Sequence, residues 1–305
     1  MTLPYMRPFR RTLKWAFGFN HDVDLRYAEL RYNPPLDPEE LYQLELSSFR
    51  RLGFDRLVFA ITDHDSVDGG LELLKRQGDR RATIALGEEL SVNHDGHLFH
   101  LGVVGLPAES CITVHDRIQC ASREGRLGEL FECLKSTGCL VILNHPLLGW
   151  DGNCAHAPLI VNFLRRFGWG IDALEYNGMR CRAENDAVLK LATSVGKPVV
   201  GGGDSHLLAA SSAICASANA ETFQDYVEEV KSGRAVTLLT REYFAPLRWK
   251  MLLRVLTFIA HYRKIARYRG HPVDAAIGRG WVLLDPVGGA SRAFLKLAAA
   301  MRLIR

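Results

Sequence analysis

Short apolar runs alternate along the chain with segments in which apolar residues recur every three or four positions. The runs predict buried strands at 57–61, 83–86, 100–104, 140–143, 173–175 and 198–200. Helical spacing predicts helices at 38–52, 127–135, 183–194 and 220–232. Strands and helices that alternate over about 220 residues indicate an α/β fold.

Polar residues of the types that bind metals follow several predicted strands. They are Thr62-Asp63-His64, Glu88-Glu89, His145, Asp204 and His206. In parallel α/β sheets and barrels, active sites lie at the carboxyl ends of strands. We therefore expect these side chains to share one end of the fold. Gly201-Gly202-Gly203 matches neither a P-loop nor a dinucleotide fingerprint, so we expect these glycines to let the backbone pass close to a metal site.

Histidine, aspartate and glutamate supply the nitrogen and oxygen donors that suit zinc, manganese or iron(II), with magnesium as a further choice. A carboxylate such as Glu89 can bridge two cations. Paired metals polarise a phosphoryl oxygen and generate hydroxide near neutral pH. This chemistry hydrolyses phosphoesters without a covalent intermediate.

The same residues resemble the motifs of the PHP superfamily, which is named for polymerase and histidinol phosphatase domains. The matching segments are Thr62-Asp63-His64-Asp65 with Gly69, Gly87-Glu88-Glu89-Leu90-Ser91, His100-Leu101 through Gly105-Leu106, Asn144-His145-Pro146, Leu174-Glu175-Tyr176-Asn177 and Gly203-Asp204-Ser205-His206. They occur in the family's order, and the resemblance covers residues 24–239. The resemblance implies a distorted (β/α)7 TIM-like barrel, in agreement with the alternation of strands and helices.

The resemblance also implies the site residues. The metal ligands would be His64, Glu89, His100, His145, Asp204 and His206. Asp63 and Asp65 would belong to the catalytic site; as alternatives, both are turn residues, or Asp63 orients His64. His97 lies three positions from His100 on the same strand, so only one of the two should face the site. Glu175 and Asn177 either belong to the site or close a barrel strand. We expect His94, His115, His156, His261 and His271 at the surface or without a functional partner.

The first motif of the family departs from its pattern here. In Asp24-Leu25-Arg26-Tyr27-Ala28, Arg26 and Ala28 occupy the two histidine places, and Asn33 occupies an aspartate place. Arginine has no lone pair to offer a metal. We therefore expect one or two divalent ions where the resemblance implies three. Arg26 would replace the lost charge and hold a phosphate bidentately. A gapped alignment, with donors from 21–24, stays open.

The predicted function is hydrolysis of a small phosphomonoester, a nucleotide or a short oligonucleotide by a metal-bound hydroxide. Arg26, Asp63 and Asp65 would be the catalytic residues. A non-catalytic or regulatory binding module on the same fold is the alternative, favoured by the loss at 26 and 28. An amidohydrolase is a third reading, but the paired-histidine strand end and the carbamylated lysine of that class are not found.

Cysteine usage and hydropathy bear on the compartment. The seven cysteines are an odd number without any C-x-x-C pair, which favours reduced thiols. The first 15 residues lack the apolar stretch of a signal peptide, and no run of about 18 apolar residues predicts a membrane-spanning helix. We expect a cytoplasmic protein.

The distribution of charge and the family resemblance together predict three parts: a basic arm (1–16), a metal-binding barrel (17–240) and a basic, amphipathic helical extension (241–305). Residues 246–305 hold 12 Lys and Arg against two Asp, a net charge of +10 in a chain of net charge +4. The extension either packs on the barrel or binds a partner. An anionic membrane surface, at the inner face of the membrane, is preferred to nucleic acid because of Trp249, Phe258 and Tyr262.

Overall fold

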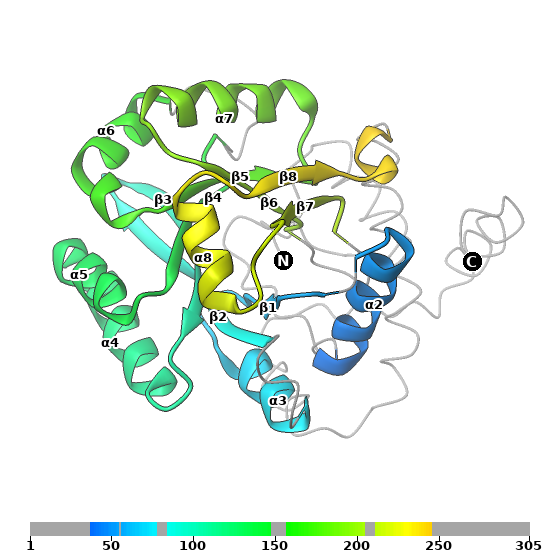
Figure 1. Cartoon of the computed structure of the whole chain (residues 1–305). Coiled ribbons are helices and arrows are strands. Elements are labelled where there is room, and N and C mark those ends of the chain that lie inside the picture. The colour runs from blue at the N-terminus through cyan, green and yellow to red at the C-terminus, as the bar shows by residue number, and fades with distance from the viewer. Residues whose placement is uncertain (1–36, 55, 78–83, 148–156, 205–210, 246–305) are drawn as a thin grey trace, which may run out of the picture. The chain divides into compact units, whose positions relative to one another are not determined.

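A computed structural model describes residues 37–54, 56–77, 84–147, 157–204 and 211–245, and these belong to one compact unit (Figure 1). Several predictions fall outside the described residues: the basic arm, Arg26, His206 and the extension from 246 onward. The three-part division of the chain therefore stays a prediction.

A curled sheet of six strands forms the centre of this unit, with its strands in the order of the sequence. They are β1 (Phe59–Ile61), β2 (Ile84–His94), β3 (His97–Leu106), β4 (Leu140–Asn144), β5 (Ala173–Asn177) and β6 (Val199–Gly202). Pairing is parallel except on both sides of β3, which runs antiparallel to β2 and β4. The prediction of strands at these six places is confirmed.

The sequence prediction missed the hairpin that joins β2 and β3. His94 pairs with His97 across a two-residue turn made by Asp95 (φ 52°) and Gly96 (φ 74°). Positive φ at both central positions is typical of the type I′ turn, which favours Asp-Gly because its twist matches that of the strands. The two strands are therefore much longer than the predicted 83–86 and 100–104, and the strict alternation of strand and helix is interrupted here.

Seven α-helices occur within the described residues. They are α2 (Pro38–Arg51), α3 (Asp68–Gln77), α4 (Cys111–Arg123), α5 (Leu127–Thr137), α6 (Ala157–Phe167), α7 (Arg182–Ser194) and α8 (Phe223–Lys231). Four match predicted helices, whereas α3, α4 and α6 were not predicted. The start of α2 is encoded locally: Asp37 accepts hydrogen bonds from the amides of Glu39 and Glu40, and Pro38 is the first helical residue.

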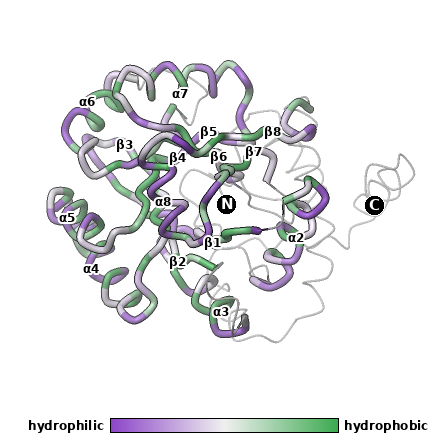
Figure 2. The backbone as a smooth tube through the Cα atoms, viewed as in Figure 1, coloured by the Kyte–Doolittle hydropathy of each residue, from purple (hydrophilic) through white to green (hydrophobic). Residues whose placement is uncertain are grey.

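The main core lies between the sheet and the helices that surround it. Tube segments of α3 to α7 alternate between hydrophobic and hydrophilic colours in Figure 2, as expected for helices that bury one face. Phe131 on α5 and Phe163 on α6 are fully buried and pack against strand residues such as Leu101 and Val141. Helix α8 packs instead on the first residues of β4 and β5, so it covers the end of the sheet opposite the carboxyl ends of these strands.

A small antiparallel sheet of β7 (Ala213–Ala216) and β8 (Val236–Leu239) lies beside β6. A Cβ added to Gly201 would lie 2.8 Å from the backbone of Ile214, so only glycine permits this approach. The close backbone approach at Gly201 is therefore made to β7, whereas the sequence predicted an approach to a metal site. The exact seven-stranded barrel stays a prediction. No helix among the described residues is long and apolar enough to cross a membrane.

Candidate metal centre

The segment after β1 places His64 beside Glu89. Residues 63–65 continue the parallel pairing with β2: the amide of Glu89 donates to the carbonyl of Asp63, and the amide of Asp65 donates to the carbonyl of Glu89, both at 3.0 Å. The ladder holds the two backbones in register. The side chains of His64 and Glu89 therefore meet at the carboxyl end of β1, as the sequence predicted.

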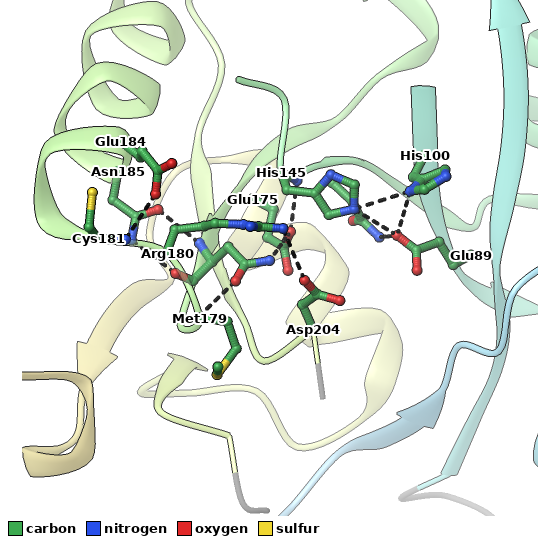
Figure 3. Close-up of polar contacts among 12 residues, drawn as sticks. Glu89, His100, His145, Glu175, Met179, Arg180, Cys181, Glu184, Asn185 and Asp204 are labelled. Carbon is green, nitrogen blue, oxygen red and sulfur yellow. Dashed lines mark hydrogen bonds and ion pairs between the residues drawn. The ribbon is translucent and has the colours of Figure 1, made fainter. Parts of the chain in front are cut away.

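The two oxygens of the Glu89 carboxylate face different histidines. Oε2 lies 3.3 Å from Nε2 of His64, whereas Oε1 lies 3.3 Å from Nε2 of His145 and 3.6 Å from Nδ1 of His100. Nδ1 of His100 is 3.2 Å from Nε2 of His145. Figure 3 shows Glu89, His100 and His145 converging from separate parts of the chain. The structure thus brings four predicted ligands together, with three histidines around the Glu89 carboxylate.

These spacings suit a divalent cation. Ligand atoms about 2.1 Å from a tetrahedral ion lie about 3.4 Å from one another. The ligand atoms of His64, Glu89 and His100 all lie within 4.8 Å of one another. His64 has 37% of its side chain exposed, whereas Glu89, His100 and His145 are at 9%, 14% and 13%. The donor set fits a metal and is open to solvent on the His64 side.

Charges and burial determine the protonation of the cluster. Burial raises the pKa of Glu89, but the hydrogen bond from His145 and the three histidine charges outweigh it and lower the pKa to about 2. Burial lowers the pKa of His100 to about 4, against the opposing charge of Glu89. Glu89 is therefore ionised and His100 neutral near pH 7, which are the forms that bind metals.

A hydrogen bond from its backbone amide holds His145 in position. Its φ of 29° is positive, and its amide donates to Oε2 of Glu175 at 2.8 Å. Glu175 is 5% exposed, accepts a second hydrogen bond from Asn177 at 3.0 Å, and has a pKa that burial raises to about 7. A non-glycine residue at positive φ costs about 1–3 kcal/mol, so surrounding contacts must hold it. Glu175 and Asn177 therefore support the site, a role that the sequence had left open.

Asn144 also contacts the cluster and was not predicted as a site residue. Its side-chain amide donates to Oε1 of Glu89 at 2.9 Å. A Cβ on Gly102 would lie 2.7 Å from Oδ1 of Asn144, so the glycine leaves the room that this side chain needs. Asn144 and Gly102 both lie within motifs noted in the sequence, where only the neighbouring histidines were predicted as ligands.

The side chains of Asp63 and Asp65 make contacts away from the Glu89 carboxylate. The carboxylate of Asp63 lies against Gly69, near the start of α3, where an added Cβ would be 2.7 Å from Oδ2. Oδ1 of Asp65 accepts hydrogen bonds from the amide of Ser91 at 2.8 Å and from Gln119 at 3.3 Å. These contacts fasten the loop that carries His64. The catalytic role of the two aspartates stays a prediction.

The expectation for His115 was wrong, because a buried carboxylate lies on the helix side of β2. Successive strand residues face opposite sides, so Glu88 points away from Glu89 and is fully buried. Its Oε1 lies 2.9 Å from Nδ1 of His115, and its Oε2 accepts a hydrogen bond from Gln119 at 2.8 Å. Helix α4 carries both His115 and Gln119. Because no helix had been predicted there, nothing in the sequence led us to expect this network.

The remaining histidines differ in the groups that they contact. His100 faces Glu89, while the ring of His97 packs on Phe99 at a centroid distance of 4.6 Å. His94 was expected without a partner, but its ring packs on Phe163 and Phe167 and its Nε2 lies 3.4 Å from Asp95. His156, His206, His261 and His271 lie outside the described residues.

Asp204 lies at the same end of the sheet but is paired differently. Its φ is 41°, and its Oδ2 lies 3.5 Å from Nη2 of Arg180, in the connection between β5 and α7. The sequence reasoning missed Arg180. Its signal was its place, three residues beyond the carboxyl end of β5, where the groups of an α/β site are expected.

Comparison with known proteins relates the fold to three solved structures. A protein from Bifidobacterium adolescentis that is named as a metal-dependent phosphoesterase has a TM-score of 0.39 and 14% identity over 63% of this chain and 90% of its own. A two-domain protein from Bacteroides vulgatus, said to contain a predicted PHP-like metal-dependent phosphoesterase, has a TM-score of 0.41 and 12% identity over 69% and 65%. An amidohydrolase from Chromobacterium violaceum with bound sulfate and no metal has a TM-score of 0.38 and 16% identity over 64% and 85%. No family model and no curated protein matches the sequence.

Proposed function

We propose that the chain is a metal-dependent phosphoesterase of the PHP superfamily. The observation that supports this most is the Glu89 carboxylate, whose two oxygens face His64 on one side and His100 with His145 on the other. This is the arrangement in which one carboxylate can serve two cations. The proposed substrate is a small phosphomonoester, a nucleotide or a short oligonucleotide.

Each residue has a defined task in this proposal. His64, His100 and His145 donate ring nitrogens, and Glu89 supplies both oxygens. A divalent cation bound there would polarise a phosphoryl oxygen and activate water near neutral pH. Asn144 orients the Glu89 carboxylate, and Glu175 holds the backbone of His145. Asp204 and His206 are proposed as further ligands on the strength of the sequence motif alone.

Zinc titration and a hydrolysis assay on the full chain test the proposal. The substrates are p-nitrophenyl phosphate, bis(p-nitrophenyl) phosphate, 5′-nucleotides and a short oligonucleotide, each with zinc, manganese or iron(II). His100→Ala is expected to lower metal affinity and hydrolysis at least tenfold, because it removes a donor from the cluster. His97→Ala is the matched control: it lies on the same strand and should leave both unchanged.

Two outcomes would contradict the proposal. If the metal-loaded protein hydrolyses none of these esters but binds metal and phosphorylated ligands, the chain is a binding module. If His100→Ala and His97→Ala behave alike, the cluster does not hold the metal.

A further inference from the structure

Arg180 lies where a ligand beside the candidate metal centre would meet it. Together with His145, Glu175 and Asn177 it lines a cavity of about 10 Å³, which is room for about one water molecule. Figure 3 shows its side chain extending toward Asp204 and His145. The side chain is 26% exposed, so it contacts both the protein interior and solvent. A bound ligand could reach the guanidinium from the solvent side.

The guanidinium of Arg180 has N–H donors that no described acceptor uses. An arginine has five N–H donors. Among the described residues, its side chain has one polar partner, Asp204 at 3.5 Å, and its buried Nε has no acceptor. A buried donor without an acceptor is unfavourable, so such a group usually serves a bound water molecule or ligand. Here the acceptor would be an oxygen of water or of a ligand.

The guanidinium itself, and not the surrounding charge, indicates the kind of acceptor. Of the described residues that line the cavity, Arg180 is the only lysine or arginine, while Glu175 and Glu184 contribute carboxyl groups. The described contact with Asp204 involves only Nη2, at 3.5 Å, which leaves the other N–H groups of the guanidinium for a second acceptor. A planar guanidinium binds carboxylate or phosphate oxygens in pairs. An oxyanion bound to a cation that His145 and Glu89 hold would therefore have Arg180 as a cationic partner in the protein.

We propose that Arg180 binds a phosphoryl oxygen of the substrate and makes the site selective for phosphate monoesters over diesters. This inference rests on the proposed phosphoesterase function. A monoester carries three non-bridging oxygens and a charge of about −1.5 to −2 near pH 7, more than a diester, which has two such oxygens and one charge. An additional cationic donor beside the metal centre therefore stabilises the bound monoester more strongly. Arg180 would thus perform the task that the sequence assigned to Arg26.

Calorimetry with inorganic phosphate tests this assignment on the full chain loaded with manganese. Arg180→Gln is expected to weaken phosphate binding at least tenfold and Arg180→Lys to weaken it less, whereas manganese affinity stays within twofold. Arg182→Gln is the matched control, because it removes the same charge two residues away. Its side chain is 81% exposed and pairs with Asp186 at 3.7 Å. This control should bind phosphate like the unaltered protein.

The steady-state constants give a second measurement. Arg180→Gln should raise the KM for p-nitrophenyl phosphate at least tenfold and change that for the bis ester less than threefold. If the glutamine variant does not fold, phosphate affinity and KM are measured on Arg180→Lys. Phosphate affinity that is unchanged in both variants overturns the inference. So does a parallel loss of phosphate and manganese affinity, which would mean that Arg180 only holds Asp204.

The two proposals fail in different ways. If phosphate binding depends on Arg180 but no ester is hydrolysed, the phosphoesterase function fails and the binding role of Arg180 stands. If esters are hydrolysed and Arg180→Gln leaves both phosphate affinity and KM unchanged, the inference alone fails. An unaltered, metal-loaded protein that binds no phosphate also overturns it.

Discussion

Replacing Gln119 with leucine tests whether helix α4 positions the metal centre. The side-chain amide of Gln119 donates to Oε2 of the fully buried Glu88 at 2.8 Å and to Oδ1 of Asp65 at 3.3 Å. Leucine has a similar size but no donor. Asp65 would keep only the amide of Ser91, and its loop also carries His64. The change should therefore affect both stability and metal binding.

The magnitude follows from the burial of Glu88. Burial already raises the pKa of this carboxyl, against the hydrogen bonds from His115 and Gln119. A hydrogen bond to a charged group contributes about 1.5–3 kcal/mol, so we expect the free energy of unfolding to fall by about 2 kcal/mol. For a domain of this size, that is a decrease in Tm of about 4–8 °C. Loosening the loop of His64 should weaken zinc affinity about tenfold, as is common when a ligand loses its support.

Urea unfolding of the metal-free protein measures the first effect, and competition for zinc with a chelating dye measures the second. Ser122→Ala is the matched control on the same helix. Its hydroxyl donates to the carbonyl of Ser91 at 2.7 Å, so the variant should lose about 1 kcal/mol of stability. Its zinc affinity should not change. If Gln119→Leu loses stability while its zinc affinity also stays unchanged, the network supports the core only, and the positioning role is refuted.

Three further predictions concern the site and the sheet. Glu89→Gln should lower zinc affinity at least a hundredfold in the dye titration, since it removes the one carboxylate that all three histidines face; a tenfold or smaller loss would contradict this. Burial lowers the pKa of His145, but the hydrogen bond to Glu89 and the nearby carboxylates outweigh it and raise the pKa above its usual value. Zinc binding must displace that proton, so the zinc affinity should fall about tenfold per pH unit below the raised pKa. A zinc affinity that calorimetry finds unchanged from pH 8 to pH 5.5 would contradict this expectation. Gly201→Ala should lower the unfolding free energy by about 2 kcal/mol because of the backbone of Ile214, and an unchanged urea midpoint would show that β6 and β7 can separate freely.

The sequence by itself determined the local elements and the identity of the central donors. Apolar runs of three to five residues located all six strands of the main sheet, because a strand buried on both faces leaves this pattern. Helical spacing located α2, and Asp37-Pro38 with the acidic first turn encode its start locally. His64, Glu89 and His145 were expected to meet, since the carboxyl ends of neighbouring strands share one edge of a sheet. His100 was expected only from the family resemblance, and it reaches the same edge because β3 runs antiparallel to β2 and β4.

The sequence was weaker where a local signal was overlooked or several patterns fit. The Asp95-Gly96 turn is a recognisable hairpin signal, yet the long β2 and β3 were expected as two short strands. Helix α4 was missed because its pattern is interrupted by buried polar residues, among them Gln119 and Ser122. Those residues face β2 because Glu88, Ser91 and Asp65 offer partners there, and partners distant in sequence leave no periodic trace.

Only the tertiary structure decided which polar groups touch which. It placed the two oxygens of Glu89 toward different histidines and turned Asp65 toward the amide of Ser91. It also set Arg180 beside Asp204, 24 positions away in the chain. Such contacts depend on the register of strands and on side-chain directions, which hydrophobic periodicity does not encode. The residue types of the site were therefore readable from the sequence, whereas their pairing, on which the chemistry depends, required the fold.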